Sequence, residues 1–190
     1  LLLVIDSMFF PFISGKAFVF RIIIELMAAA WTGLLVIDFK RYWPRWNFVS
    51  IALTVFVGIA FVTSFFGVDF TMSLWSNFER MEGLITYLHL LLLFFALAGT
   101  FHTRREWFTL LSVSIFVSVL VAFYGLLEAT GEITSFADSS RIISTLGNPL
   151  YVAAYLSFNI FLAMFLWLQT TSSTARWFLG GVILFESTIL

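Results

Sequence analysis

The sequence predicts an all-α membrane protein, a polytopic transmembrane helical bundle with about seven crossings. It is 61% hydrophobic and only 11% charged, whereas a soluble domain carries about 25% charged residues. Apolar runs of roughly 20 residues recur along the chain, and each can cross the ~30 Å hydrocarbon core of a bilayer as a helix. Lipid offers no hydrogen-bond partners, so only helices or a closed barrel can span it. The runs lack the alternation of strands, which favours helices.

Hydropathy places the helices in order along a single transmembrane domain, residues 1–190. The expected segments are 1–14, 17–38, 48–66, 83–100, 107–127, 150–169 and from about 177 to the last residue. We read the first and last as parts of helices that the sequence cuts short. Tryptophans at several of the predicted ends fit the aromatic belts of membrane interfaces; they are Trp43, Trp46, Trp75, Trp107 and Trp177.

The loops between these helices fall into two sets that alternate along the chain. One set is short and basic, with Lys40, Arg41, Arg45, Arg104, Arg105 and Arg176. The other contains Lys16 and two long, net acidic loops, 67–82 and 128–149. The positive-inside rule places the basic set in the cytoplasm. The sequence therefore predicts a protein of the bacterial cytoplasmic membrane with a cytoplasmic N-terminus and two long loops on the outer face.

Charge and composition also limit the partners. The net charge of −1 predicts no nucleic-acid partner, and the absence of cysteine excludes disulfides and thiolate metal sites. We find no nucleotide-binding glycine loop, nucleophile elbow or metal-ligand cluster, so no metal or cofactor is expected.

Charges inside membrane segments are functional candidates by default, because lipid makes them costly. Arg21 and Glu25 are spaced i,i+4 on one helix face, and Lys16 precedes them at the outer end. Arg21 is expected either to contact an anionic substrate, tuned by Glu25, or to form a self-neutralising pair with Glu25 that ties this helix to a neighbour.

The first long loop carries a hydrophobic residue at every third position. These residues are Met72, Trp75, Phe78 and Met81. The spacing predicts a short amphipathic helix in the outer interface. Arg80 is expected either to contact the phosphate of a lipid-linked substrate or to be a solvated charge beside this anchor.

The second long loop ends in a turn and a helix start. Gly147 permits a tight turn, Asn148 is a suitable N-cap, and Pro149 suits the first helical position. Arg141 precedes them. An arginine beside a helix N-terminus is expected to hold a diphosphate, and the alternative is an interfacial arginine beside an ordinary cap.

Three other titratable residues draw attention. His89 is expected to bond to a neighbouring helix, with proton transfer as the alternative. His102 is expected to be a solvated interface residue. Glu186 lies inside the last predicted helix as a candidate intramembrane carboxylate.

Three stretches resemble the bacterial O-antigen ligase and polymerase family. They are Phe10 to Arg21, Gly67 to Asp69 with Ser73 to Gly83, and Arg141 to Pro149. The resemblance implies a helical fold of the GT-C type that transfers a glycan from undecaprenyl diphosphate to an acceptor on the outer membrane face. The acceptor is lipopolysaccharide core, glycan or protein, and no metal is implied. Arginines of the family hold the diphosphate, and Arg141 matches the arginine before its "GNP" segment. Arg80, Arg21 and Lys16 are the further substrate-binding candidates.

The family's histidine, thought to activate the acceptor hydroxyl, belongs to a later loop and has no counterpart before residue 190. Neither His89 nor His102 lies in a predicted outer loop. We therefore expect the N-terminal half of such an enzyme, inactive alone, with its base beyond residue 190. Two other classes remain open: a small-solute or bicarbonate-type transporter, and a structural membrane subunit.

Overall fold

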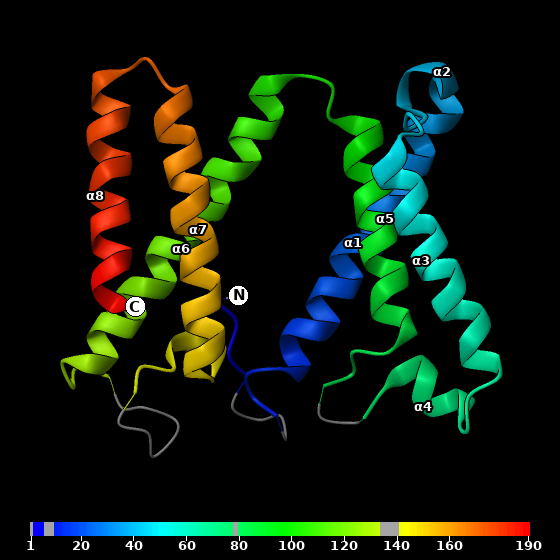
Figure 1. Ribbon diagram of the computed structural model, residues 1–190, viewed down its shortest axis with the longest axis horizontal. Helices are drawn as coiled ribbons and strands as arrows, with labels where there is room; N and C mark the ends of the chain where they lie inside the picture. The colour runs from blue at the N-terminus through cyan, green and yellow to red at the C-terminus, as the bar shows by residue number, and fades with distance from the viewer. Residues whose placement is uncertain (1, 6–9, 78–79, 134–140) are drawn as a thin grey trace. The chain divides into compact units, whose positions relative to one another are not determined.

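The computed structural model describes residues 2–5, 10–77, 80–133 and 141–190, and in these residues it is helical without a strand. The helices are shown in Figure 1. They are α1 (Ser14–Ile37), α2 (Phe39–Tyr42), α3 (Phe48–Phe65), α4 (Phe70–Trp75), α5 (Leu84–Thr100), α6 (Arg104–Ala129), the 3₁₀ turn η1 (Ser144–Leu146), α7 (Pro149–Gln169) and α8 (Ser173–Ile189). This confirms the predicted all-α architecture.

Four of these helices are long and apolar enough to cross a membrane. They are α1, α3, α6 and α7, and α5 is a shorter apolar helix. The structure thus supports a helical membrane bundle, with four spans by length and hydropathy in its described part rather than the seven that we predicted.

The predicted helix over residues 1–14 is wrong for its described residues. Residues 2–5 and 10–13 are not helical, and α1 begins only at Ser14. The chain folds back instead, with the Ile5 N–H donating to the Pro11 carbonyl at 3.2 Å. Proline lacks an N–H and disfavours helical backbone in the residue before it, which accounts for the break at Phe10 and Pro11. The cytoplasmic placement of the N-terminus relied on this crossing and loses that support.

The chain divides into two compact units, and the prediction of one transmembrane domain stays a prediction. Residues Ile5–His102 form one unit, and Leu1–Val4 with Thr103–Leu190 form the other. In the first unit, α5 packs against both α1 and α3. In the second, α7 and α8 form an antiparallel pair, and α6 packs against both (Figure 1).

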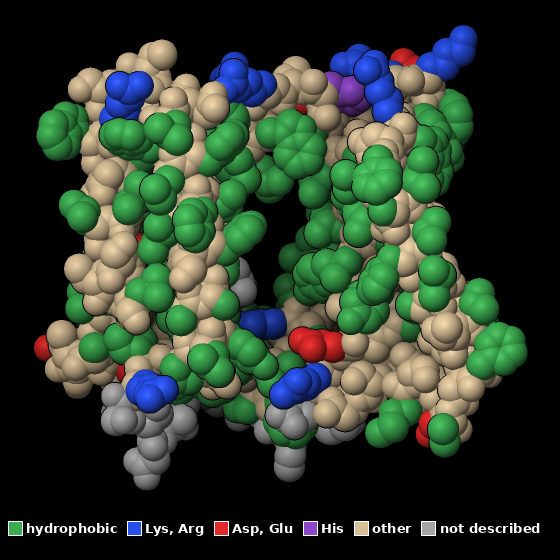
Figure 2. Space-filling model, viewed as in Figure 1, with side chains coloured by type: hydrophobic (Ala, Val, Ile, Leu, Met, Phe, Trp, Pro, Cys, Tyr) green, Lys and Arg blue, Asp and Glu red, His purple; other side chains and the backbone are tan. Residues whose placement is uncertain are grey.

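Each unit exposes many of its large apolar side chains. In the second unit, for example, Phe161 is 69% exposed and Trp177 is 81% exposed, while Ala122 and Ala163 are fully buried. On the face of each unit seen in Figure 2, hydrophobic side chains cover the middle and Lys and Arg gather at the ends. Exposing such an apolar surface to water would cost free energy, whereas contact with lipid chains would not. Small residues inside allow the helix backbones to approach closely.

Local caps explain where several helices begin. Capping boxes start α3, with Asn47 and Ser50, and α6, with Thr103 and Glu106. In each box, two backbone N–H groups at the helix start are satisfied by side chains of the same turn.

Gly99 tests this close packing. Its α5 backbone lies against the Tyr42 carbonyl and the Trp31 indole, which bond to each other at 3.1 Å, and a Cβ at Gly99 would collide with both. We expect Gly99→Ala to lower the free energy of unfolding by about 1–3 kcal/mol, the usual cost of overpacking. Thermal unfolding in detergent measures this.

Gly58→Ala is the matched control, because nothing lies within 4 Å of a Cβ built on that glycine of α3. Equal stability of the two variants would contradict the packing described at Gly99.

Candidate functional site

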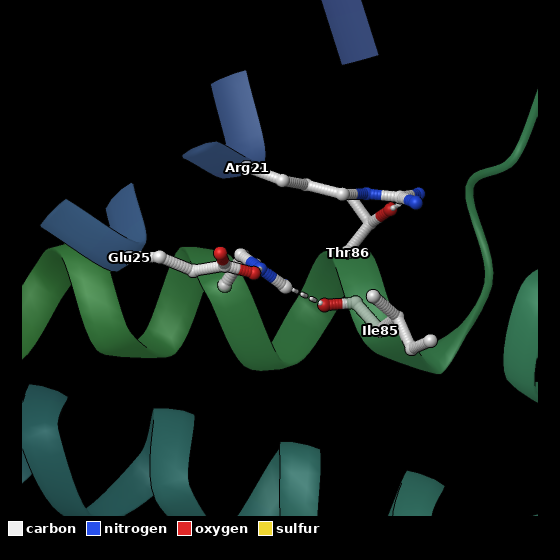
Figure 3. Close-up of polar contacts among 5 residues, drawn as sticks. Arg21, Glu25, Ile85 and Thr86 are labelled. Atoms are coloured by element: carbon white, nitrogen blue, oxygen red, sulfur yellow. Dashed lines mark hydrogen bonds and ion pairs between the residues drawn. The ribbon is translucent and has the colours of Figure 1, made fainter. Parts of the chain in front are cut away.

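Arg21 is a buried anchor in the first unit, only 7% exposed. Its Nη2 donates to the Met81 carbonyl at 2.5 Å and to Thr86 Oγ1 at 3.3 Å. The Thr86 hydroxyl donates to the same carbonyl at 3.0 Å, and the guanidinium carbon lies 5.8 Å from the Trp75 ring centroid. Figure 3 shows Arg21 reaching from α1 to Thr86 at the start of α5. Arg21 therefore fastens α1 to the loop that enters α5.

This contact coincides with local backbone strain. Met81 has a φ of 52°, in the left-handed region that costs a non-glycine residue free energy. The Met81 carbonyl accepts the bonds from Arg21 and Thr86. These two bonds help to hold the loop in its strained conformation.

Glu25 pairs with His89 in this structure. His89 Nε2 lies 3.3 Å from Glu25 Oε1, and His89 Nδ1 lies 2.7 Å from the Ile85 carbonyl. Figure 3 labels Glu25 on α1 and Ile85 on α5. This confirms that His89 bonds to a neighbouring helix. Arg21 does not pair with Glu25 in the described structure, since it bonds to the Met81 carbonyl and to Thr86. The expected tie of this helix to a neighbour is nevertheless present, because Thr86 belongs to α5.

The predicted amphipathic helix of the first long loop is formed only in part. Helix α4 ends at Trp75, Ser76 has a φ of 65°, and Met81 is not helical. The chain must turn back because Gly83 sits on the backbone of Leu74, where a Cβ would collide. The stripe predicted through Met81 is therefore broken, and Phe78 and Glu79 lie outside the described residues.

Arg80 and Lys16 are in the same unit as Arg21. Arg80 is exposed, and its backbone N–H donates to Asn77 Oδ1 at 2.9 Å. Lys16 lies in the first turn of α1 with its Nζ 5.9 Å from the Phe12 ring centroid. Of the predicted substrate-binding residues in this unit, Arg80 is the most accessible.

In the second unit, Glu128 holds the segment before α7. Its Oε2 accepts from the backbone N–H of Ile143 at 3.1 Å and of Ser144 at 2.7 Å. The Ser144 hydroxyl donates to the Val121 carbonyl at 2.8 Å. Both contacts join this segment to α6, so Glu128 is a structural anchor that sequence reasoning placed only among the loop charges.

The turn and cap predicted after this segment are confirmed. Gly147 has a φ of 74°, the left-handed conformation that glycine adopts most readily. Asn148 Oδ1 accepts from the Leu150 N–H at 2.9 Å, and Pro149 is the first residue of α7.

Arg141 is exposed just before this turn and lines a groove of about 450 Å³. The other residues of the groove are mainly apolar: Ile142, Pro149, Leu150, Val152, Ala153, Ile189 and Leu190. Arg141 is the charged residue of this set. Asp138, part of the same predicted loop, lies outside the described residues.

The other end of the second unit is basic. Arg104 of α6 bonds to Gln169 at the end of α7, and Arg176 Nε donates to the Thr170 carbonyl at 3.0 Å. In the first unit, His102 is exposed and its Nε2 lies 2.9 Å from the Arg41 carbonyl. The side chains of Arg104, Arg176 and His102 thus each contact a residue in or directly after another helix of the same unit.

Sequence reasoning missed a polar cluster inside the second unit. Glu186 of α8 and Ser118 of α6 are fully buried and bonded at 2.5 Å, and the fully buried Asn159 of α7 accepts from Ser114 at 2.8 Å. Glu186 was singled out, but its partners could not be named. A serine or asparagine in an apolar helix is a weak signal until the facing helix is known.

Within the described ranges, no three His, Cys, Asp or Glu residues are grouped to hold a metal ion. Comparison of the chain with family models, with curated proteins and with solved structures found no match.

The Arg21 anchor leads to a stability prediction. Arg21→Gln shortens the side chain and removes a charged donor from the Met81 carbonyl, and hydrogen bonds to charged groups contribute about 1.5–3 kcal/mol. We expect a loss of that size in the free energy of unfolding and faster proteolysis within residues 76–83.

Arg80→Gln is the matched control, because the exposed Arg80 side chain should leave stability unchanged. An Arg21→Gln variant as stable and protease-resistant as wild type would argue against the anchor.

The hydrogen bonds of Glu128 lead to a second stability prediction. Glu128→Ala leaves the Ile143 and Ser144 N–H groups without their acceptor, and each unsatisfied buried group costs about 1–3 kcal/mol. We expect faster amide hydrogen exchange at residues 143–147 together with lower thermal stability. Glu132→Ala, which removes an exposed carboxylate a few residues on, should change neither; identical exchange in the two variants would exclude Glu128 as the anchor.

Proposed function

We propose that this chain forms the N-terminal part of a membrane glycan transferase of the O-antigen ligase type. It would take a glycan from undecaprenyl diphosphate and pass it to an acceptor at the outer face of the bacterial cytoplasmic membrane. The proposal includes a GT-C-like arrangement in which α5 and α8 cross the membrane together with α1, α3, α6 and α7. The acceptor, whether lipopolysaccharide core, glycan or protein, is left open.

The observation that carries the proposal is the groove at Arg141. A polyprenyl diphosphate needs an apolar surface for its isoprenoid chain and cations for its head group. The groove offers apolar side chains such as Leu150, Val152 and Ile189 with Arg141 among them. Asn148 and Pro149 start α7 at the same place, and a helix N-terminus favours an anion.

The chemistry requires a stabilised leaving group and a base. When the glycosyl bond to the diphosphate breaks, negative charge develops on the leaving oxygen, and a preorganised guanidinium stabilises that charge. Arg141 would supply it in its own unit. In the other unit, Arg80 and Lys16 are the cations that we propose for substrate binding. Arg21 would act chiefly by holding the loop that contains Arg80. The acceptor hydroxyl needs a general base, which we place beyond residue 190.

The orientation follows from the basic ends. Arg104, Arg105 and Arg176 lie at the start of α6 and of α8, and the positive-inside rule puts these ends in the cytoplasm. Because α6 and α7 are antiparallel, the Arg141 groove would then face outward, where the lipid-linked donor is presented.

A membrane transporter is the second candidate function. The polar cluster around Glu186 and Asn159 favours it, because intramembrane polar groups often belong to ion or proton pathways. We expect glycan transfer to depend on Arg141, whereas transport would not require the groove at Arg141.

Arg141→Ala tests the proposal. In the complete protein, we expect glycan transfer from undecaprenyl diphosphate to fall about 10²-fold, the usual effect of removing one charge-stabilising group. Transfer is followed in membranes with a labelled lipid-linked glycan, at expression equal to that of wild type.

Arg176→Ala is the control, since it removes an arginine from the opposite end of the same unit and should leave transfer intact. Near-wild-type transfer by Arg141→Ala would remove the basis for the assignment, and transport that depends on Glu186 without any transfer would favour the second candidate.

A further inference from the structure

The polar cluster of the second unit lies at the middle of its two long helices. Ser118 is residue 15 of the 26 in α6, and Asn159 is residue 11 of the 21 in α7. Glu186 approaches Ser118 from α8, and Glu186, Ser118 and Asn159 are each 0% exposed. A carboxyl group is therefore enclosed at the depth where a membrane protein has no access to bulk water.

The hydrogen atoms around Ser118 can be counted. Ser118 Oγ lies 2.5 Å from Glu186 Oε1 and 2.8 Å from the Ile115 carbonyl. A serine hydroxyl has one hydrogen to donate, while a carbonyl and an ionised carboxylate only accept. With an ionised Glu186, the single Ser118 hydrogen would have to be shared between both short contacts. With a protonated Glu186, the acid donates to Ser118 and Ser118 donates to Ile115, and both contacts are hydrogen bonds.

The surroundings of Glu186 agree with this count. The only ion pair that the described residues show is the His89–Glu25 pair of the other unit. Glu186 Oε2 is buried without a hydrogen-bond partner, a costly arrangement for a charged carboxylate and a much cheaper one for a neutral acid.

In the part of the chain that the structure describes, the helices packed against α8 place no cation in an ion pair with this carboxyl. A titratable neighbour on α7 is Tyr155, which interacts electrostatically with Glu186. From α6, the group that faces Glu186 is the neutral Ser118. Ser118 can donate to this carboxyl, but among the described neighbours no cation stabilises its ionised form.

We propose that Glu186 is a proton-binding site in the membrane interior. Its neutral carboxyl group donates to Ser118, and Ser118 donates to the Ile115 carbonyl, which joins α8 to α6 by a directed chain of two hydrogen bonds. The ligand is a proton, and the site is separate from the groove at Arg141 and independent of the transferase proposal.

Infrared spectroscopy of the complete protein in lipid nanodiscs tests this directly. At neutral pH, the wild-type spectrum minus that of Glu186→Gln should contain the C=O stretching band of one protonated carboxylic acid. The band should move to lower frequency in D₂O, because the acid hydrogen exchanges. Glutamine has the same shape and can donate to Ser118, so Glu186→Gln should fold with an unchanged Tm.

Glu132→Gln is the control, because Glu132 is exposed and its difference spectrum should show only carboxylate bands. If the Glu186 difference spectrum shows carboxylate bands alone, the proposal is overturned. It is overturned as well if the acid band disappears when sodium chloride replaces choline chloride, since the site would then hold a metal cation in place of the proton.

Discussion

Polar groups inside a bilayer have no water to bond with, and the structure of this chain depends on how they find partners in protein. Three buried or partly buried side chains show the consequence. Arg21 donates to the Met81 carbonyl, Glu128 accepts from Ile143 and Ser144, and Glu186 shares a hydrogen bond with Ser118. The first two fasten a loop to a helix, and the third joins two helices. Each contact fixes the position of a loop or helix along its neighbouring helix, which apolar packing alone would not determine.

The packing of apolar residues determines how closely the helices approach one another. Many large aromatic and aliphatic side chains are exposed, and small residues lie beside leucine, isoleucine and valine where the helices pack. Gly99 admits the Tyr42 carbonyl and the Trp31 indole, and Ser118 admits the carboxyl of Glu186. In lipid, this close approach is what favours helix association, because apolar side chains gain little by leaving apolar solvent.

These contacts separate the positioning residues from those able to meet a substrate. The Arg21 side chain is buried, whereas the Arg80 and Arg141 side chains are exposed. Glu128 sets the path of the chain from Ile143 to Ser144 and thereby the position of the Arg141 groove beside α7. A change at Glu128 would therefore disturb the candidate site without touching a ligand.

The sequence by itself determined the helical membrane architecture and most helix positions, because runs of apolar residues and the requirement for satisfied backbone groups leave few alternatives. It also determined the turn at Gly147 and the cap at Asn148, since both depend on neighbours in the chain. It failed at residues 1–14, where hydropathy outweighed the effect of Pro11, and in the loop after Trp75, where a three-residue spacing suggested more helix than forms. Only the tertiary structure decided that Glu25 meets His89, that Arg21 holds Met81, and that Glu186 lies against Ser118. These pairs join residues about 60 positions apart or more in the chain, and no local pattern encodes which face of one helix will meet which face of another.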